Sequence, residues 1–165
     1  MACFLIVPTG TPWQKAPPSP AEHRYLMAVI ATAADPRFTV SRVDVDRPGP
    51  TYTSDTLADL RAQLGPGVAL HFITGADALR DFPTWRDPER VLAQSHLIAV
   101  TRPDHAIALD GLPSQAITVV AIPALAISSS DIRERVRHGM PIDYLVPQGV
   151  AAYIRKHRLY RDDPA

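Results

Sequence analysis

The chain has 165 residues, enough for one domain with a substantial core, and its 46% hydrophobic and 21% charged residues are typical of an ordinary globular protein. Lys plus Arg and Asp plus Glu balance at 17 each, so the composition excludes a strongly basic surface for nucleic acid. One cysteine, Cys3, excludes an internal disulfide and a multi-cysteine zinc site, and the lack of a long apolar segment excludes a membrane span, so we predict a cytoplasmic protein.

Strand-like and helix-like segments alternate along the sequence. Short apolar runs predict strands over residues 4–7, 38–43, 68–73, 97–100 and 118–122. Helices are predicted over residues 19–33, 53–64 and 88–93, from the serines after residue 127 to near residue 139, and from residue 147 to about residue 157. Ser19 and either Thr53 or Ser54 are the predicted caps of the first two helices, because hydroxyl oxygens accept hydrogen bonds from the free N–H groups of a first turn.

This alternation predicts an α/β fold with a largely parallel sheet covered by helices on both faces. We expect residues 1–165 to form a single domain, with residues 128–165 as its C-terminal helical part. In such sheets, ligands bind beyond the carboxyl ends of the strands. Polar clusters follow the first, third, fourth and fifth predicted strands, so a binding site is predicted at that edge.

Three consecutive serines, Ser128 to Ser130, lie where an apolar strand-like run meets a helix, and Arg133 follows one turn later. A helix start offers unpaired N–H groups and a partial positive charge, and the hydroxyls and the guanidinium add donors suited to phosphate oxygens. Helix capping by Ser128, with Asp131 three residues on, is the simpler alternative. The two interpretations are compatible, because both use the same N–H groups.

Two further sets of residues are candidates for contacts with a nucleotide. Gly75 after a buried strand would let a ligand approach the backbone, and Asp77 could accept hydrogen bonds from ribose hydroxyls, although a glycine turn with an Asp cap is equally compatible. Trp85 could stack on a flat heteroaromatic ring or simply pack in the core. The sequence contains no P-loop, no G-x-G-x-x-G and no H-E-x-x-H, so these nucleotide loops and a zinc site of this type are not expected.

Four more residues carry groups that phosphate could contact. Tyr52 and Thr53 offer hydroxyls just before or at a helix start, suited either to phosphate or to capping. Arg102 at a strand end and Lys15 in the first loop are candidate phosphate partners, and a solvated surface charge is the ordinary alternative for each.

Taken together, these residues resemble those of bacterial nicotinate-nucleotide adenylyltransferases. The resemblance covers nearly the whole chain and lies in ISSSDIR at 127–133, GMPIDYLVP at 139–147, Tyr153-Ile154, Leu159-Tyr160, Val7-Pro8, Lys15, His23-Arg24, Tyr52-Thr53, ITGAD at 73–77, Thr84-Trp85 and Arg102-Pro103. The serine-rich motif alone is shared with other nucleotidyltransferases such as pantetheine-phosphate adenylyltransferase. Tyr52-Thr53 with Trp85 is the combination that points to a pyridine nucleotide.

The resemblance implies a Rossmann-like nucleotidyltransferase fold and adenylyl transfer from ATP to nicotinate mononucleotide, with Mg²⁺, in NAD biosynthesis. Its partners are these small molecules, with no nucleic acid or membrane and with a homo-oligomer left open. It assigns Ser128, Ser130 and Arg133 to the ATP phosphates as the catalytic residues. It further assigns Gly75 and Asp77 to adenosine, assigns Tyr52, Thr53, Trp85, Arg102 and Lys15 to the nicotinate mononucleotide side, and implies no protein metal ligand.

One family motif does not occur in the sequence. Members of the family begin with a strand, a loop of the form G-G-T-F-D-P-x-H-x-G-H and a helix, whereas no H-x-G-H pair is found here. We therefore expect the first β-α unit of the family to be missing, most simply because the sequence starts too late. The alternatives are a short nucleotide-binding protein with impaired catalysis, or an adenylyltransferase for nicotinamide mononucleotide or phosphopantetheine.

Overall fold

The structure is a computed structural model, and it describes residues 3–13, 19–101, 113–123 and 125–161, apart from the side chains of residues 76 and 77. Its strands are β1 (Phe4–Ile6), β2 (Thr11–Pro12), β3 (Phe38–Val40), β4 (Pro50–Thr51), β5 (His71–Gly75), β6 (His96–Thr101) and β7 (Ile117–Ala121). Its helices are α1 (Ala21–Thr32), α2 (Thr53–Leu64), α3 (Ala76–Arg80), α4 (Pro88–Gln94), α5 (Ser129–Arg137) and α6 (Gln148–Lys156), with short 3-10 turns at Phe82–Thr84 and Ser114–Ala116. None of the helices within the described ranges is long and apolar enough to cross a membrane.

The predicted strands are confirmed, and all strand pairs in the described part of the chain are parallel. The pairs form three groups, β1 with β3, β2 with β4, and β5-β6-β7. The two-residue strands β2 and β4 were not predicted, because Gly10 and Pro50 beside and within them are typical of loops. The α/β class predicted from the alternation of elements is confirmed.

The chain divides into two compact units. Met1–Thr51 and Ala126–Ala165 together form one, which we call the terminal unit, and Tyr52–Leu125 forms the other, the central unit. That residues 1–165 form a single domain stays a prediction.

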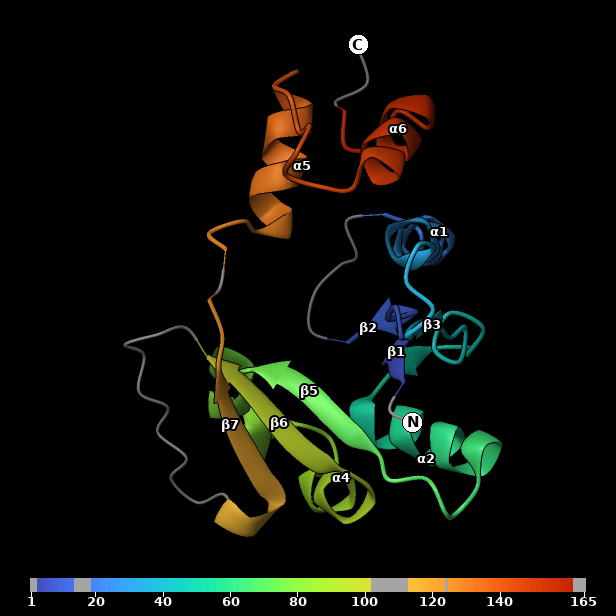
Figure 1. The fold of residues 1–165 in the computed structure, drawn as a ribbon. Helices are drawn as coiled ribbons and strands as arrows, with labels where there is room; N and C mark the ends of the chain where they lie inside the picture. The colour runs from blue at the N-terminus through green and yellow to red at the C-terminus, as the bar shows by residue number, and fades with distance from the viewer. Residues whose placement is uncertain (1–2, 14–18, 102–112, 124, 162–165) are drawn as a thin grey trace. The chain divides into compact units, whose positions relative to one another are not determined.

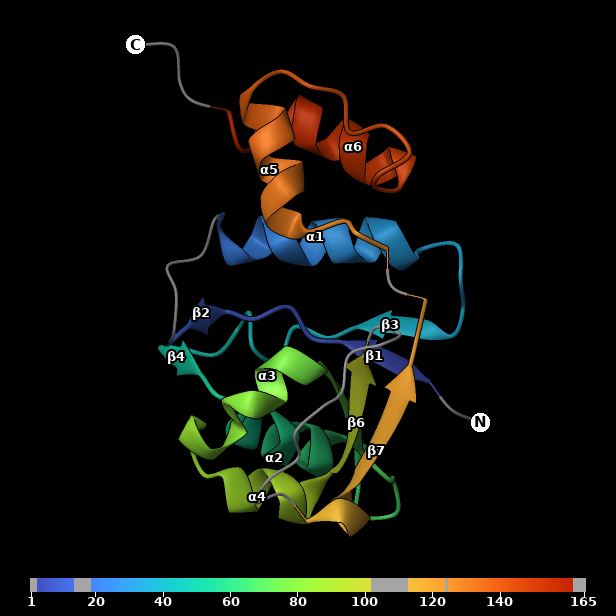
Figure 2. The same ribbon diagram turned by 90° about the vertical axis from the view of Figure 1, so that its left-hand side faces the viewer.

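The central unit is built on the parallel strands β5, β6 and β7 (Figure 1). Side chains alternate between the two faces of a strand, and one face carries the buried residues Leu97, Ala99 and Ile117. These pack with residues of α2, α3 and α4, so the three helices cover that face (Figures 1 and 2). On the other face, Ile73 and Val120 are 48% and 39% exposed.

The terminal unit places three helices around a second core. Ile132 of α5 and Val150, Ala151 and Ile154 of α6 are buried there, and Ile30 of α1 packs against them. Figure 2 shows α5 and α6 beside α1, although α1 lies far from both in the sequence. Pairing of β1 with β3, in the register Phe4 with Phe38, follows the same alternation of strand and helix.

Two predicted helix caps are wrong. Helix α1 has Pro20 as its N-cap, and the hydroxyl of Ser19 lies 3.3 Å from the hydroxyl of Tyr160 instead. Tyr52, in an extended conformation, is the N-cap of α2, so Thr53 and Ser54 lie inside the helix. In both cases the chain bends into the helix one or two residues from the expected hydroxyl, a distance that local sequence does not fix.

Candidate active site

Ser128 caps helix α5, as the sequence predicted. Its backbone is extended, with φ −111° and ψ 151°, and its Oγ accepts a hydrogen bond from the N–H of Asp131 at 3.0 Å. The first bond within the helix runs from the N–H of Ile132 to the carbonyl of Ser128. The N–H groups of Ser129 and Ser130 precede that bond and therefore belong to the unpaired donors of a helix start.

Ser130 and Arg133 are brought together on the first turn of α5. The Arg133 guanidinium donates a hydrogen bond of 2.9 Å to Oγ of Ser130. Ser130 is exposed and Arg133 is half-buried. The guanidinium has further donors, and no hydrogen bond from them reaches another residue that the structure describes. Hydroxyl, guanidinium and helix N–H groups thus lie within one turn, a combination suited to phosphate oxygens.

Gly75 is both the last residue of β5 and the N-cap of α3, so the strand passes directly into the helix. Its φ of −69° and ψ of 147° are open to any residue, and a Cβ added there would meet no atom within 4 Å. The fold of the described residues therefore does not require a glycine at this position. Asp77 is the second residue of α3, and its side chain lies outside the described part.

Tyr52 is the N-cap of helix α2, and the guanidinium of Arg86 lies over its ring. Its carbonyl accepts hydrogen bonds of 3.0 Å from the N–H groups of Asp55 and Thr56, and no side chain caps the helix. The guanidinium carbon of Arg86 lies 4.5 Å from the centroid of the Tyr52 ring, within the range of cation–π contacts. Thr53 is the first residue of α2.

Trp85 is half-buried and packs against the core of the central unit. Its ring meets Phe72 edge-on, with centroids 5.9 Å apart, and lies tilted against Phe82 at 5.2 Å. Phe82 is 1% exposed, so this contact belongs to the core. Core packing, one of the two expectations for Trp85, is thus observed, and stacking on a ligand ring stays a prediction.

The predicted residues fall into separate groups. Ser128, Ser130 and Arg133 lie together in the terminal unit, whereas Tyr52, Thr53, Gly75 and Trp85 belong to the central unit. Lys15 and Arg102 lie outside the described residues.

Sequence reasoning named Arg24 only as part of the family resemblance and missed its structural role. From α1 the Arg24 guanidinium donates hydrogen bonds of 2.6 Å to the carbonyl of Thr9 and 2.7 Å to the carbonyl of Gly10, so it holds the loop after β1. Burial lowers the pKa of Arg24. The acceptors are backbone carbonyls, which every residue carries, so no sequence signal identified this contact.

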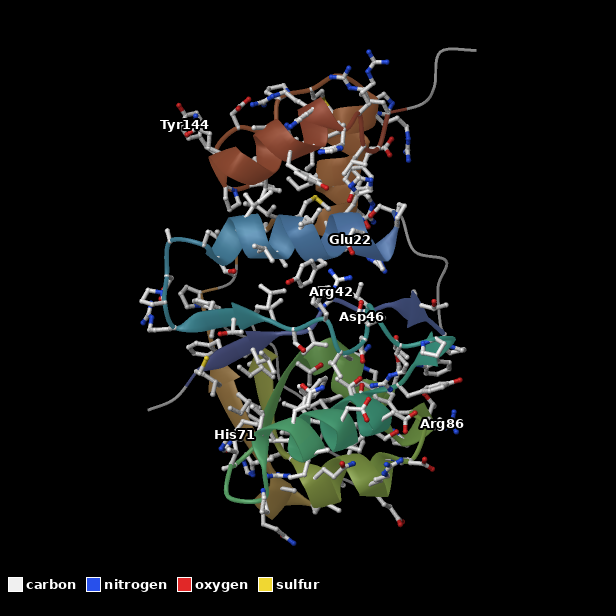
Figure 3. The ribbon with its side chains drawn as sticks, turned by 90° about the vertical axis from the view of Figure 1, so that its right-hand side faces the viewer. Glu22, Arg42, Asp46, His71, Arg86 and Tyr144 are labelled. Atoms are coloured by element: carbon white, nitrogen blue, oxygen red, sulfur yellow. The ribbon has the colours of Figure 1, made fainter. Side chains whose placement is uncertain are left out.

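Arg42 was missed as well. Its guanidinium donates to the carboxylates of Glu22 and Asp46, at 3.0 Å and 2.9 Å for the shortest contacts, and lies 4.6 Å from the centroid of the Tyr25 ring (Figure 3). Hydrogen bonds to Glu22 first and Asp46 second raise the pKa of Arg42. The 4-residue spacing of Arg42 and Asp46 is a weak sequence signal for this cluster.

No group of three or more His, Cys, Asp or Glu side chains that could hold a metal ion occurs among the residues that the structure describes.

Comparison of the chain with family models and with solved structures identifies the class of its fold. A family model described as cytidylyltransferase-like matches residues 2–135. The structure of Plasmodium falciparum nicotinic acid mononucleotide adenylyltransferase complexed with NaAD superimposes with a TM-score of 0.74 at 20% identity, over 97% of this chain and 83% of that one. By fold, the chain is a cytidylyltransferase-like protein.

Curated relatives narrow the class to one family. A probable nicotinate-nucleotide adenylyltransferase of Leifsonia xyli subsp. xyli is 59% identical over 157 residues, which cover 95% of this chain and 78% of the relative. One from Streptomyces coelicolor is 56% identical over 161 residues, covering 96% and 85%. The chain belongs to the nicotinate-nucleotide adenylyltransferase family.

Proposed function

We propose that the chain transfers the adenylyl group of ATP to nicotinate mononucleotide, giving deamido-NAD and diphosphate, a step of NAD biosynthesis. The observation that carries the proposal is the identity of 55–59% with relatives of that name, over 94–98% of the chain. At this identity the folded chains and their site residues are expected to correspond closely.

The chemistry requires positioning and charge stabilisation rather than a protein nucleophile. A phosphate oxygen of nicotinate mononucleotide attacks the α-phosphorus of ATP and forms the new P–O bond. The bond from the α-phosphorus to the bridging oxygen breaks, and its electron pair leaves with diphosphate. Negative charge on the transferred group and the leaving diphosphate must be stabilised by fixed donors.

In the terminal unit, Ser128, Ser130 and Arg133 are the proposed phosphate ligands. The free N–H groups at the start of α5 and the unused Arg133 donors support this role. Arg133 is the proposed catalytic cation, because a guanidinium can donate hydrogen bonds to phosphate oxygens and so stabilise the negative charge that develops on the departing diphosphate.

In the central unit, Gly75 and Asp77 are the proposed adenosine contacts, and Tyr52, Thr53 and Trp85 are the proposed acceptor side. The fold does not require a glycine at position 75, which supports the first assignment. Without a side chain there, a ligand could approach the backbone closely. Lys15 and Arg102, for which the same acceptor role is proposed, lie outside the described residues.

Mg²⁺ enters this proposal as part of the substrate. The described residues offer no carboxylate cluster for it. Mg²⁺ binds phosphate oxygens and keeps several waters in many nucleotide enzymes, so MgATP is the form expected to bind.

A second candidate is nucleotide binding with little turnover. The observation in its favour is that the sequence contains no H-x-G-H pair, a motif of the loop with which members of the family begin. Binding and turnover are therefore measured separately.

The test incubates the 165-residue chain with MgATP and one acceptor at a time, and follows dinucleotide and diphosphate by chromatography. The acceptors are nicotinate mononucleotide, nicotinamide mononucleotide and phosphopantetheine, and calorimetry gives the affinity for each. Deamido-NAD as the preferred product supports the first candidate, and binding of ATP and nicotinate mononucleotide without product supports the second. Preferred transfer to another acceptor, or binding of neither substrate, would contradict both.

A further inference from the structure

Arg24 holds the backbone just beyond the carboxyl end of β1. From α1 its guanidinium donates to the carbonyls of Thr9 and Gly10, which follow that strand, at 2.6 Å and 2.7 Å. Ligands of α/β folds bind beyond the carboxyl ends of parallel strands. At this end of the strand, the position of the backbone matters to a ligand as well as to the fold.

Arg61 makes a comparable contact at the other end of a strand pair. From α2 its guanidinium donates to the carbonyl of Val68, shortly before β5, and at 3.0 Å to the carbonyl of Gln94, shortly before β6. These residues lie at the amino ends of the strands, where a ligand is not expected. Arg61 is therefore a structural counterpart of Arg24 within the same chain.

Stability alone does not favour an arginine at position 24. Among the described residues, Nε of Arg24 is buried without a hydrogen-bond partner, whereas Nε of Arg61 is not such a donor. No carboxylate in the described part of the chain pairs with Arg24, and burial lowers its pKa. A buried donor without a partner and a partly buried cation without a counterion both cost free energy, and such costs are typical of functional sites. The uncompensated charge also favours an anionic ligand nearby.

The segment that Arg24 holds presents two hydroxyls to solvent. Thr9 and Thr11 are exposed, whereas Gly10 between them is buried, an alternation that is typical of extended chain. Gly10 lies so close to the carbonyl of Asp44 that an added Cβ would overlap it, so the buried side of the segment is fixed. The hydroxyls of Thr9 and Thr11 make no hydrogen bond with the residues that the structure describes. They are therefore available to a ligand.

A second contact connects this segment with the residues proposed for the acceptor. Oγ1 of Thr51 donates a hydrogen bond of 3.2 Å to the carbonyl of Thr11, and β2 pairs with β4 in the register Thr11 with Pro50 (Figure 2). Thr51 is the last residue of β4 and directly precedes Tyr52 and Thr53 in the sequence. The strand that pairs with the segment therefore leads directly into residues of the proposed acceptor side.

We infer that Arg24 is a positioning residue for the acceptor, which holds Thr9 and Thr11 so that their hydroxyls donate to oxygen atoms of nicotinate mononucleotide. This inference rests on the proposed function. Arg24 itself acts through the backbone, because its hydrogen bonds go to carbonyls of the segment.

Calorimetry on the 165-residue chain tests the inference without requiring turnover. The two ligands are nicotinate mononucleotide and a non-hydrolysable ATP analogue. Arg24→Gln is expected to weaken binding of nicotinate mononucleotide about tenfold, the scale of one or two misplaced hydrogen bonds, and to change the affinity for the ATP analogue less than about twofold.

Arg61→Gln is the matched control, because it removes the same charge and the same kind of carbonyl contacts at the amino ends of strands. Each of the two Gln variants is expected to lower Tm by about 2–6 °C, since each loses two hydrogen bonds. Only Arg24→Gln is expected to weaken binding of nicotinate mononucleotide. Affinities are measured well below the Tm of every variant, so that a loss of stability by itself does not change them.

Two further variants decide the question even if Arg24→Gln does not fold. Thr51→Val removes the hydroxyl that holds the carbonyl of Thr11 and keeps the shape of the side chain. The double variant Thr9→Val/Thr11→Val removes the exposed hydroxyls themselves and is expected to change Tm by less than about 2 °C. Both are expected to weaken binding of nicotinate mononucleotide several-fold.

Four outcomes would overturn the inference. Equal acceptor affinities of Arg24→Gln and Arg61→Gln would make Arg24 a purely structural contact, and equal weakening of both ligands by Arg24→Gln would indicate a general effect of its charge. An unchanged acceptor affinity of Thr9→Val/Thr11→Val would remove the residues through which Arg24 acts. In these three outcomes the proposed function stands. If the unsubstituted chain did not bind nicotinate mononucleotide, the proposed function would fail together with the inference.

Discussion

Nδ1 of His23 and the hydroxyl oxygen of Tyr153 lie 2.8 Å apart, which joins α1 to α6 across 130 residues of sequence. The Tyr153 ring also packs on His157, with centroids 4.2 Å apart. This contact stabilises the terminal unit at the position where its first and last helices meet.

Removing the Tyr153 hydroxyl is expected to destabilise the protein modestly. Tyr153→Phe keeps the ring and loses one partly buried hydrogen bond, a cost of about 1 kcal/mol, or about 2–4 °C in Tm for a chain of this size. Tyr25→Phe is the matched control, because its hydroxyl makes no hydrogen bond with the described residues. Thermal unfolding followed by circular dichroism checks the difference, and equal melting points would contradict it.

The same hydroxyl predicts a pH dependence. Burial first, and the charge of Glu22 second, raise the pKa of Tyr153 above its ordinary value of 10.0. The unfolded chain then loses this proton first, so the contribution of Tyr153 is complete below about pH 10 and is lost as the pH rises through the folded pKa. The stability difference between the unsubstituted chain and Tyr153→Phe should therefore shrink above pH 10 in urea titrations. A constant difference up to pH 11.5 would argue against the raised pKa.

Gly10→Ala is expected to destabilise the terminal unit. A Cβ at position 10 would overlap the carbonyl oxygen of Asp44 and lie 2.9 Å from its carbonyl carbon, so backbone must move at a cost of about 1–3 kcal/mol. Gly67→Ala is the control, because a Cβ there meets no atom within 4 Å, and a change below about 0.5 kcal/mol is expected. Denaturant unfolding compares the two. Similar values for both would show that the loop around Gly10 yields easily.

Gly75→Ala separates a requirement of the fold from one of the ligand. The backbone at this position suits alanine and the Cβ would be unobstructed, so the free energy of unfolding should change by less than about 0.5 kcal/mol. If adenosine approaches this backbone, the added methyl should weaken ATP binding about fivefold or more, on the scale of about 1 kcal/mol for mild overpacking. Calorimetry with a non-hydrolysable ATP analogue measures this affinity for the unsubstituted chain and for Gly75→Ala. Equal affinities would remove Gly75 from the proposed site.

The three serines at the start of α5 are expected to respond differently to alanine. Ser128→Ala loses the hydrogen bond from the N–H of Asp131 and should cost about 1 kcal/mol of stability. Ser130→Ala removes the hydroxyl that accepts from Arg133 and should weaken ATP binding several-fold with little effect on stability. Ser129→Ala, which loses no hydrogen bond to a described residue, is the control for both measurements. If Ser130→Ala and Ser129→Ala bound ATP with the same affinity, the assignment of Ser130 to the ATP phosphates would be contradicted.

The sequence predicted the elements whose signals are local. Apolar runs located β1, β3, β5, β6 and β7, and the serine at 128 with Asp131 three residues on located the cap of α5. Local signals were less informative at α1 and α2. Pro20 and Tyr52 are the N-caps of these helices, and the Ser19 hydroxyl contacts the hydroxyl of Tyr160 instead. A hydroxyl near a helix start identifies the start within a residue or two but does not fix its own partner.

Contacts that depend on distant backbone were not predictable. Arg24 binds carbonyls of Thr9 and Gly10, and the close approach of Gly10 to Asp44 depends on how two loops meet. Arg86 reaches a tyrosine 34 positions earlier, too far along the sequence for one helix or strand to bring the two together. The residues proposed for the site were therefore found from the sequence and the family resemblance, whereas these long-range contacts were found only in the structure.

The central unit is an insertion within the terminal unit, because the chain leaves the latter after Thr51 and returns at Ala126. During synthesis, Met27 and Ile30 of α1 are made long before their partners on α6, because the whole central unit lies between them in the sequence. At about 5–20 residues per second, the apolar side of α1 waits uncovered on the ribosome for several seconds or more, while the central unit can already fold. Chaperone binding to the nascent chain should therefore concentrate on α1 and end when α6 appears.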